Sequence, residues 1–172
     1  MSSPGDLPER PLDLIRLLEA LARHGVDYVV VGGVAVQAHG HRRTTKDLDV
    51  IPAPEPENYE RLSAALEELS ARQRGVDPGS VALSPADPER LRIAAIIPPL
   101  TTIHGELRIL NAAKGAPAYE DLRRRALTVE LDGIPVTIAA LEDLIRMKRA
   151  SGRPADLEDI AVLTAIEDAP PE

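Results

Sequence analysis

Three consecutive valines, Val29 to Val31, end a stretch that we interpret as a β-strand over residues 26–31. Valine-rich strands without regular polar alternation suit a sheet that is covered on both faces. Gly32 and Gly33 follow directly and end the strand. The chain is therefore constrained to a fold in which helices pack against a sheet.

The spacing of apolar and turn-forming residues predicts further helices and strands along the chain. Helices are predicted over residues 12–24, 34–38, 59–71, 119–126, 139–150 and 154–166, and strands over 46–51, 91–97, 103–110, 127–131 and 134–138. The last two strands flank Asp132-Gly133, a strong hairpin signal. Residues 75–90, rich in Gly, Pro, Asp and Ser, are predicted to form a loop that could include a short turn of helix. This order predicts an α+β fold, in which a small mixed β-sheet carries flanking helices and a C-terminal helical pair.

The length of 172 residues fits one domain with a small helical appendage. We predict a flexible N-terminus at 1–10, an α+β domain at 11–138, a helical pair packed on it at 139–167, and a tail at 168–172. The N-terminus lacks the apolar segment of a signal peptide, and no apolar run approaches the length of a membrane span. These features predict a cytoplasmic protein without a membrane partner.

Composition excludes several classes of function. The formal net charge is -8, so duplex DNA is not an expected partner, although a local basic patch could bind RNA or a nucleotide. Cysteine is absent, which excludes disulfides, a thiolate nucleophile and a cysteine zinc site. Phe and Trp are also absent and only 3 Tyr are present, so aromatic platforms for stacking bases are scarce.

The candidate site consists of the paired glycines and an Asp-Leu-Asp sequence about a dozen residues later. Gly32 and Gly33 lie where a strand is predicted to pass into a helix, and such a turn lets phosphate approach the backbone and the helix N-terminus. Asp47 and Asp49 lie two residues apart on a predicted strand, so both carboxylates project from one face. Two carboxylates that repel each other suit a divalent cation, which can support phosphoryl or nucleotidyl transfer.

The stretch Arg43-Thr44-Thr45-Lys46-Asp47-Leu48-Asp49 resembles the signature of the nucleotidyltransferase superfamily typified by polymerase β. It is most similar to the small bacterial branch of minimal nucleotidyltransferases and abortive-infection-type toxins. Residues 136–145 and 147–156 resemble the C-terminal helices of that branch, so the resemblance covers roughly residues 12–166. It implies that residues 11–138 form a nucleotidyltransferase-like domain.

The resemblance also implies roles for individual residues. Gly32, Gly33, Arg43, Thr45 and Lys148 would bind the nucleoside triphosphate. Asp47 and Asp49, with Glu106 as a third carboxylate, would be catalytic and would hold Mg²⁺ in a two-metal site.

The third carboxylate is where this chain departs from the superfamily pattern. In the sequence Gly105-Glu106-Leu107-Arg108-Ile109, the position of the usual third aspartate is occupied by Arg108. Glu106 shares its face and could supply the carboxylate. Alternatively, Arg108 could place a guanidinium near Asp47 and Asp49, replacing a metal with a salt bridge and preserving the fold without the chemistry.

Other charged residues allow a simpler interpretation beside a functional one. Lys148 could be a phosphate ligand or a solvated lysine in the last turn of a helix. Asp156 and Asp159 are predicted to be acids at a helix start, and His41 to lie at the surface. The basic run 123–125 is predicted to be a solvated face.

Two functions follow from these residues. The first is a metal-dependent transferase that moves a nucleoside monophosphate from a nucleoside triphosphate to a hydroxyl of RNA, protein or a small molecule. The resemblance implies a place in a toxin–antitoxin or phage-defence system, with a cognate toxin or antitoxin partner. The second is a catalytically degenerate, antitoxin-like binding or regulatory module with the same fold.

Overall fold

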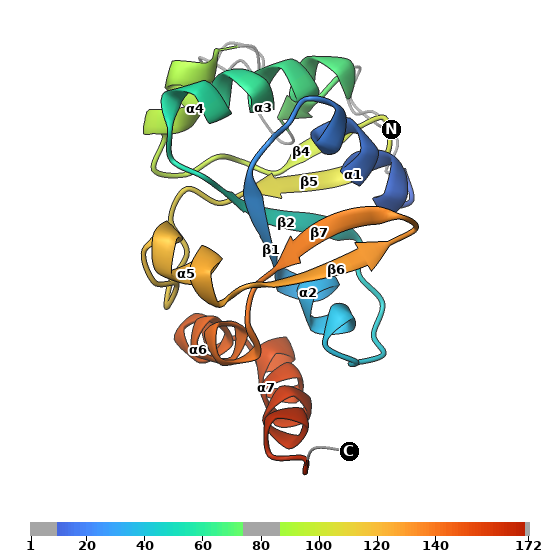
Figure 1. Cartoon of the computed structure of the whole chain (residues 1–172), viewed down its shortest axis with the longest axis vertical. Helices are drawn as coiled ribbons and strands as arrows, with labels where there is room; N and C mark the ends of the chain where they lie inside the picture. Colours follow the sequence, from blue (N-terminus) through green and yellow to red (C-terminus); the bar gives the residue numbers. More distant parts are fainter. Residues whose placement is uncertain (1–9, 74–86, 171–172) are drawn as a thin grey trace, which may run out of the picture.

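The computed structural model describes residues 10–73 and 87–170, and in these residues the chain forms a mixed sheet of seven strands between two layers of helices (Figure 1). From edge to edge the strands are β3 (Arg72–Gln73), β4 (Leu100–Thr102), β5 (Gly105–Ile109), β2 (Asp47–Pro52), β1 (Tyr28–Val31), β7 (Ile134–Ile138) and β6 (Leu127–Leu131). β1 pairs in parallel with β7, β2 in parallel with β5, and the other neighbours are antiparallel.

Helices cover the sheet from both sides (Figure 1). α1 (Leu14–Arg23), α3 (Pro56–Glu68) and α4 (Pro88–Ile93) lie on one side, whereas α2 (Gly32–Ala38), α6 (Leu141–Ser151) and α7 (Pro154–Glu167) lie on the other. α5 (Tyr119–Arg125) lies beside the sheet, above α6 in Figure 1. This arrangement confirms the predicted α+β fold with its C-terminal helical pair. None of the helices in the described part of the chain is long and apolar enough to cross a membrane.

The strands that carry the candidate site are held in register by a shared core. Leu48 and Val50 of β2 and Leu107 of β5 are almost fully buried, in the same cluster as the leucines of α1 and α3. Removing a leucine side chain from water stabilises a fold by about 1.5–3 kcal/mol. Because side chains alternate along a strand, the burial of Leu48 places Asp47 and Asp49 on the opposite face.

The predicted strand over residues 91–97 is wrong, because these residues begin inside α4. Asp87 caps this helix by accepting a hydrogen bond from the Arg90 backbone N–H, and Pro88 occupies its first position. Leu91 and Ile97 are buried in the core but Ile93 is 66% exposed, so only part of the apolar run packs inward. The short strands β3 and β4 were not predicted from the sequence. The predicted loop at 75–90 lies outside the described residues up to position 86.

The hairpin of β6 and β7 is confirmed with its predicted turn. Asp132 and Gly133 both have positive φ, 53° and 81°, as a two-residue hairpin turn of this kind requires. α6 ends at Gly152, whose φ of 65° allows the chain to leave the helix before Pro154 begins α7. The boundaries of the four units predicted from the sequence stay predictions.

Gly115, in the loop from β5 to α5, and Gly133, in the turn between β6 and β7, both have positive φ but differ in how closely other atoms approach them. A Cβ at Gly133 would meet nothing within 4 Å, whereas a Cβ at Gly115 would lie 2.7 Å from the Arg146 carbonyl oxygen of α6. We expect Gly133→Ala to lower the free energy of unfolding by about 1 kcal/mol, through backbone strain alone. Gly115→Ala should cost roughly 1–3 kcal/mol more because of overpacking. Urea unfolding of both variants measures the difference, and equal losses would contradict the packing described for Gly115.

Candidate functional site

The two aspartates of β2 lie beside two charged residues of β5. The register pairs Asp47 with Glu106 and Asp49 with Arg108, and it pairs Asp49 with Val31 on the other side. Val31 immediately precedes the two glycines. The structure thus brings the predicted glycines, the two aspartates and Glu106 to one region of the sheet.

Gly32 contacts the carboxylate of Asp49. Its φ is 69°, and a Cβ at this position would lie only 2.2 Å from Asp49 Oδ2, so a side chain cannot be accommodated. Gly33 lies equally close to Thr45, where a Cβ would come within 2.7 Å of Oγ1. The Thr45 hydroxyl donates to the Asp47 carbonyl at 3.2 Å. The absence of side chains at both glycines therefore allows the turn to pack against the strand that carries the aspartates.

Asp49 is electrostatically strained. Burial, followed by the neighbouring Asp47 carboxylate, raises the pKa of Asp49 to about 7, although Arg108 and Lys148 oppose the increase. Its Oδ1 atom is buried and has no hydrogen-bond partner among the described residues. Such an unsatisfied buried oxygen is costly, and a water, an ion or a ligand at this position would relieve the cost.

Arg108 lies close to the carboxylates of Asp47, on β2, and Glu106, on β5. Its Nε atom lies 3.6 Å from Glu106 Oε1 and 3.9 Å from Asp47 Oδ2. Both distances are longer than a hydrogen bond. The guanidinium therefore lies beside Asp47 and Glu106, and it does not replace the missing partner of Asp49.

The donor set fits a divalent cation held by Asp47 and Asp49. These are hard oxygen ligands, and one of them has a buried atom without a partner among the described residues. Asp49 and Gly32 also line a cavity. In the described part of the chain, no group of three or more His, Asp or Glu side chains is arranged to hold a metal ion. A cation on the two aspartates would thus take its other ligands from water and substrate.

Two cavities adjoin the aspartates, one on each side of the pair along β2. The smaller, of about 210 Å³, is lined by Gly32, Asp49 and the inner face of α6. Three cationic side chains also line it, from Lys114, Lys148 and Arg153. The larger, of about 610 Å³, is lined by Asp47 and Glu106 with Thr45, Lys46, Thr101, Gly105 and residues 10–12.

Asp159 of α7 forms the centre of a buried ion-pair network. Its side chain is 3% exposed and contacts Lys148 Nζ at 3.1 Å, His41 Nε2 at 3.3 Å and the Arg43 guanidinium. The prediction that His41 lies at the surface is wrong, because its side chain is only 11% exposed. The Arg43 guanidinium points to Asp159, and its role in nucleotide binding stays a prediction.

Lys148 is buried rather than solvated. Its side chain is 11% exposed, and Nζ also contacts Asp156 Oδ1 at 3.1 Å. Burial alone would raise the pKa of Asp156, but hydrogen bonds from Lys148 and Arg153 outweigh it and hold the pKa at about 2. Asp156 does accept from the Arg153 backbone N–H at the helix start, as expected, but it is also part of this network.

The sequence of α7 contains a pattern that could have predicted this network, although its acids were interpreted as helix-start residues. Asp156, Asp159 and Leu163 are the buried residues of α7, and their spacing places them on one helical face. Reading that face as a buried stripe would have identified both acids as partners for inward cations. Lys114 also lines the smaller cavity, but it belongs to no motif and no sequence pattern predicted its place there.

The basic run of α5 is mostly engaged with acids. Arg125 donates to the fully buried Asp143 of α6 at 2.8 and 3.1 Å, and Arg124 pairs with Asp121 of its own helix. Arg124 is 70% exposed, in keeping with a solvated face, whereas Arg125 links α5 to α6.

Comparison with known proteins identifies the family of the chain. The model of the family described as nucleotidyltransferases of unknown function, DUF6036, matches residues 11–168. The chain belongs to this family. The predicted relationship to the nucleotidyltransferase superfamily is thereby confirmed. A comparison with curated proteins gives no match.

Solved structures of nucleotidyltransferases share the fold. The solution structure of the antibiotic-resistance factor ANT(2'')-Ia has a TM-score of 0.56 at 16% identity, with 91% of this chain and 82% of that one covered. The crystal structure of ANT(2'')-Ia in complex with adenylyl-2''-tobramycin has a TM-score of 0.56 at 17% identity, with 91% and 87% covered. An antigenic nucleotidyltransferase-like protein from Paracoccidioides brasiliensis has a TM-score of 0.52 at 17% identity, with 90% and 78% covered. At these identities the likeness shows the fold alone.

The raised pKa of Asp49 predicts how stability depends on pH. A carboxyl whose folded pKa is raised stabilises the fold below its unfolded pKa of about 4, and that stability is lost as pH rises towards 7. We therefore expect Asp49→Asn to become more stable than wild type as pH rises from 4 to 8, by up to about 4 kcal/mol. Urea unfolding in a metal-free buffer measures this difference, with the exposed Glu60→Gln as control. A difference that does not change with pH would contradict the assignment.

The network around Asp159 predicts a large loss of stability when its charge is removed. Asp159→Asn leaves Arg43 and Lys148 without their shared carboxylate, and breaking a buried pair costs about 3–5 kcal/mol. The neighbouring Glu158 is exposed, so Glu158→Gln should change stability by less than about 0.5 kcal/mol. Urea unfolding at pH 7 compares the two variants. Similar small losses in both would show that the network contributes little.

Proposed function

We propose that the chain transfers a nucleoside monophosphate from a nucleoside triphosphate to an acceptor hydroxyl, with Mg²⁺ held by Asp47 and Asp49. The observation that carries this proposal is the buried Asp49 carboxylate, which packs against Gly32 and has one oxygen without a partner. A site that was only structural would gain stability from a neutral residue here. The two carboxylates instead lie on one face of β2, where a bound cation would neutralise them and bind a phosphate group.

The smaller cavity suits the phosphates of the nucleotide. Its volume of about 210 Å³ is below that of typical pockets for whole ligands, so it would hold part of the nucleotide. Lys114, Lys148 and Arg153 supply positive charge in its lining, and Gly32 allows close approach to the backbone. Asp156 and Asp159 hold the ammonium of Lys148 in place. Arg43 and Thr45 support this region from the loop before β2.

The larger cavity suits the acceptor, because Asp47 and Glu106 both line it. The acceptor oxygen would form a bond to the α-phosphorus, and the bond from that phosphorus to the bridging oxygen would break, releasing pyrophosphate. Glu106 is positioned to take the proton of the acceptor hydroxyl. Bound Mg²⁺ would supply charge neutralisation at the transferring phosphate. The second cation that the family resemblance implies would need Glu106 as a ligand, and this arrangement stays a prediction.

The reaction type is consistent with the family and with one similar structure. The family description names nucleotidyltransferases, and adenylyl-2''-tobramycin, bound to ANT(2'')-Ia, carries an adenylyl group of the kind that such a transfer would add. A toxin–antitoxin or phage-defence role and a cognate partner protein remain proposals that rest on the resemblance described above. A cytoplasmic location remains a proposal that rests on the polar N-terminal sequence and the short apolar runs.

A second candidate function is a binding module that has lost catalysis. The observation that favours it is Arg108, whose Nε atom lies within 4 Å of both Asp47 and Glu106. A guanidinium in this position could take the charge-neutralising role of a cation. The module would then bind nucleotide, or a protein partner, without transferring anything.

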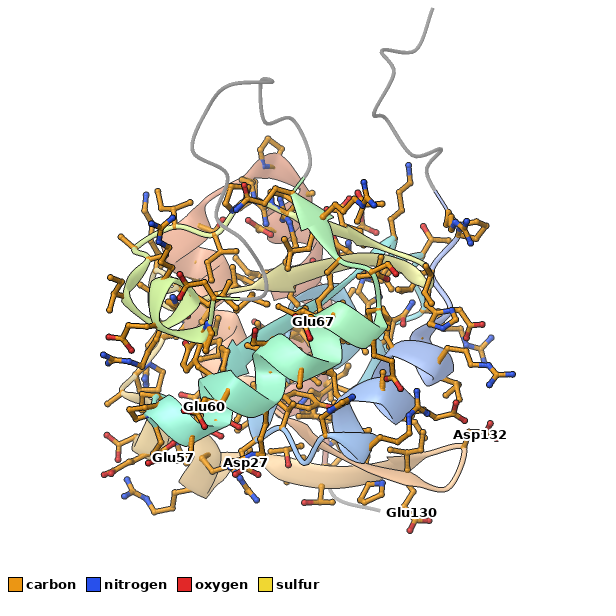
Figure 2. The ribbon with its side chains drawn as sticks, turned by 90° about the horizontal axis from the view of Figure 1, so that it is seen from above. Asp27, Glu57, Glu60, Glu67, Glu130 and Asp132 are labelled. Atoms are coloured by element: carbon orange, nitrogen blue, oxygen red, sulfur yellow. The ribbon has the colours of Figure 1, made fainter. Side chains whose placement is uncertain are left out.

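Thermal stability in the presence of nucleotides tests both candidates. We expect a nucleoside triphosphate with Mg²⁺ to raise the melting temperature, because a ligand at a hundred times its dissociation constant stabilises a fold by about 2.7 kcal/mol. The shift should disappear in Asp47→Asn/Asp49→Asn and persist in Glu57→Gln/Glu60→Gln. These control acids lie on α3, and Figure 2 labels both on the outer side of that helix.

Release of pyrophosphate then separates the enzyme from the module. Nucleotide binding with release of pyrophosphate supports the transferase. Nucleotide binding without release in the wild type supports the degenerate module, particularly if Arg108→Asp gains the release of pyrophosphate. A shift that does not need Mg²⁺ would favour the module, in which Arg108 takes the place of the cation. No shift with any of the common nucleoside triphosphates at several millimolar, with or without Mg²⁺, would contradict both nucleotide-binding functions.

A further inference from the structure

The acceptor side of the candidate site carries a group of cationic side chains. Arg10 and Lys46 line the larger cavity, and Arg108 lies beside two carboxylates of its lining, Asp47 and Glu106. Once a cation on Asp47 and Asp49 neutralises that pair, the cavity has more positive than negative charge. An acceptor that enters it would therefore meet a cationic surface.

Arg108 is oriented in a way that suits a phosphate ligand. Its closest approach to the carboxylates of Asp47 and Glu106 is through Nε. Its terminal Nη1 and Nη2 atoms make no hydrogen bond to any described residue, and the side chain is 39% exposed. A partly exposed guanidinium whose terminal nitrogens make no such hydrogen bond is suited to bind phosphate through two parallel hydrogen bonds.

The exposed acids that Figure 2 labels are not among the lining residues of either cavity. Figure 2 labels six exposed acids: Asp27, Glu57, Glu60, Glu67, Glu130 and Asp132. Those of α3 lie on the side of the sheet opposite α6, whereas Asp49 faces the cavity that α6 lines. Around the larger cavity, Arg10, Lys46 and Arg108 lie beside the acids Asp47 and Glu106. Once a cation neutralises Asp47, these three cations outnumber the remaining carboxylate, and cationic side chains attract anionic ligands.

We propose that the acceptor carries a phosphate on the same sugar as the hydroxyl that is nucleotidylated, and that Arg108, with Lys46 and Arg10, binds this phosphate. This inference rests on the proposed function and specifies its acceptor. The cavity of about 610 Å³ is large enough for a nucleoside 5'-phosphate unit. The unit can come from a free mononucleotide or from the 3' end of an RNA.

Under this inference Arg108 binds the acceptor, so its presence at the position of the usual third aspartate does not mark a loss of catalysis. The sugar hydroxyl oxygen attacks the α-phosphorus of the nucleoside triphosphate, its proton passes to Glu106, and pyrophosphate leaves with the electrons of the broken bond. The phosphate of the acceptor stays intact throughout and serves only for binding. A polycationic acceptor would be repelled by the same three side chains.

Acceptor pairs that differ only in the phosphate test this inference. The full-length protein with Mg²⁺ and each α-³²P-labelled nucleoside triphosphate would be given adenosine, adenosine 5'-monophosphate, an oligoadenylate with a free 3' hydroxyl, or tobramycin. We expect labelling of at least one phosphorylated acceptor at least tenfold faster than that of adenosine, and no labelling of tobramycin. The ratio between the mononucleotide and the oligoadenylate identifies the source of the unit.

Three variants connect the preference to the proposed residues. Arg108→Gln and Lys46→Gln should each reduce the preference for the phosphorylated acceptor by raising its KM, while labelling of adenosine changes much less. Lys46 is exposed and Lys46→Gln leaves the contacts of Arg108 intact, so this variant tests the inference even if Arg108→Gln disturbs the fold. Arg124→Gln, a change at an exposed arginine of α5, should have no effect.

The outcomes separate this inference from the proposed function. Equal labelling of adenosine and its phosphorylated forms, or a preference for tobramycin, would overturn the inference and leave the transferase intact. A phosphate preference that survives both Arg108→Gln and Lys46→Gln would overturn the assignment of these residues. Mg²⁺-dependent nucleotide binding without labelling of any acceptor would overturn the inference and support the degenerate module, and no nucleotide binding would overturn the proposed function itself.

Discussion

The alternation of side chains along β2 is the constraint on which the rest of the site depends. Leu48 and Val50 are buried with the leucines of α1 and α3, so the strand cannot shift by one residue without moving them out of the core. The same alternation holds Asp47 and Asp49 on the other face, where Gly32 meets Asp49. The favourable burial of apolar side chains on one face thus maintains an unfavourable arrangement of carboxylates on the other.

The C-terminal helices complete the site by supplying charge. α6 contributes Lys148 to the cavity beside Asp49, and α7 contributes Asp156 and Asp159, which hold that lysine. Asp159 also contacts Arg43 and His41, which precede β2, so one carboxylate links the helical pair to the loop before the aspartates. Charges buried in this way need several partners, because the loss of hydration is compensated only when the hydrogen bonds and ion pairs are satisfied. The network explains how a helical pair remote in sequence is held against the loop that precedes the aspartates.

Sequence patterns predicted best the parts of the molecule that local chemistry determines. The turn at Asp132-Gly133 was predicted correctly because both residues tolerate positive φ. The common face of Asp47 and Asp49 was predicted correctly because strand periodicity is independent of context. Residues 91–97 were predicted wrongly, because their apolar side chains suggested a strand while the cap at Asp87 and the proline after it begin a helix. Prediction of His41 also failed, because its burial depends on Asp159, more than a hundred residues away in the chain.

The sequence by itself determined the fold class, the family resemblance, the two glycines and the two aspartates, since each follows from short-range spacing or from a motif. Only the tertiary structure decided that Asp49 has a buried oxygen without a partner, that Arg108 contacts Asp47 and Glu106 rather than Asp49, and that Lys148 is buried between Asp156 and Asp159. The physical reason is that desolvation and ion pairing depend on which distant elements pack together. Local periodicity specifies the direction in which a side chain projects, but not the charges that it meets there.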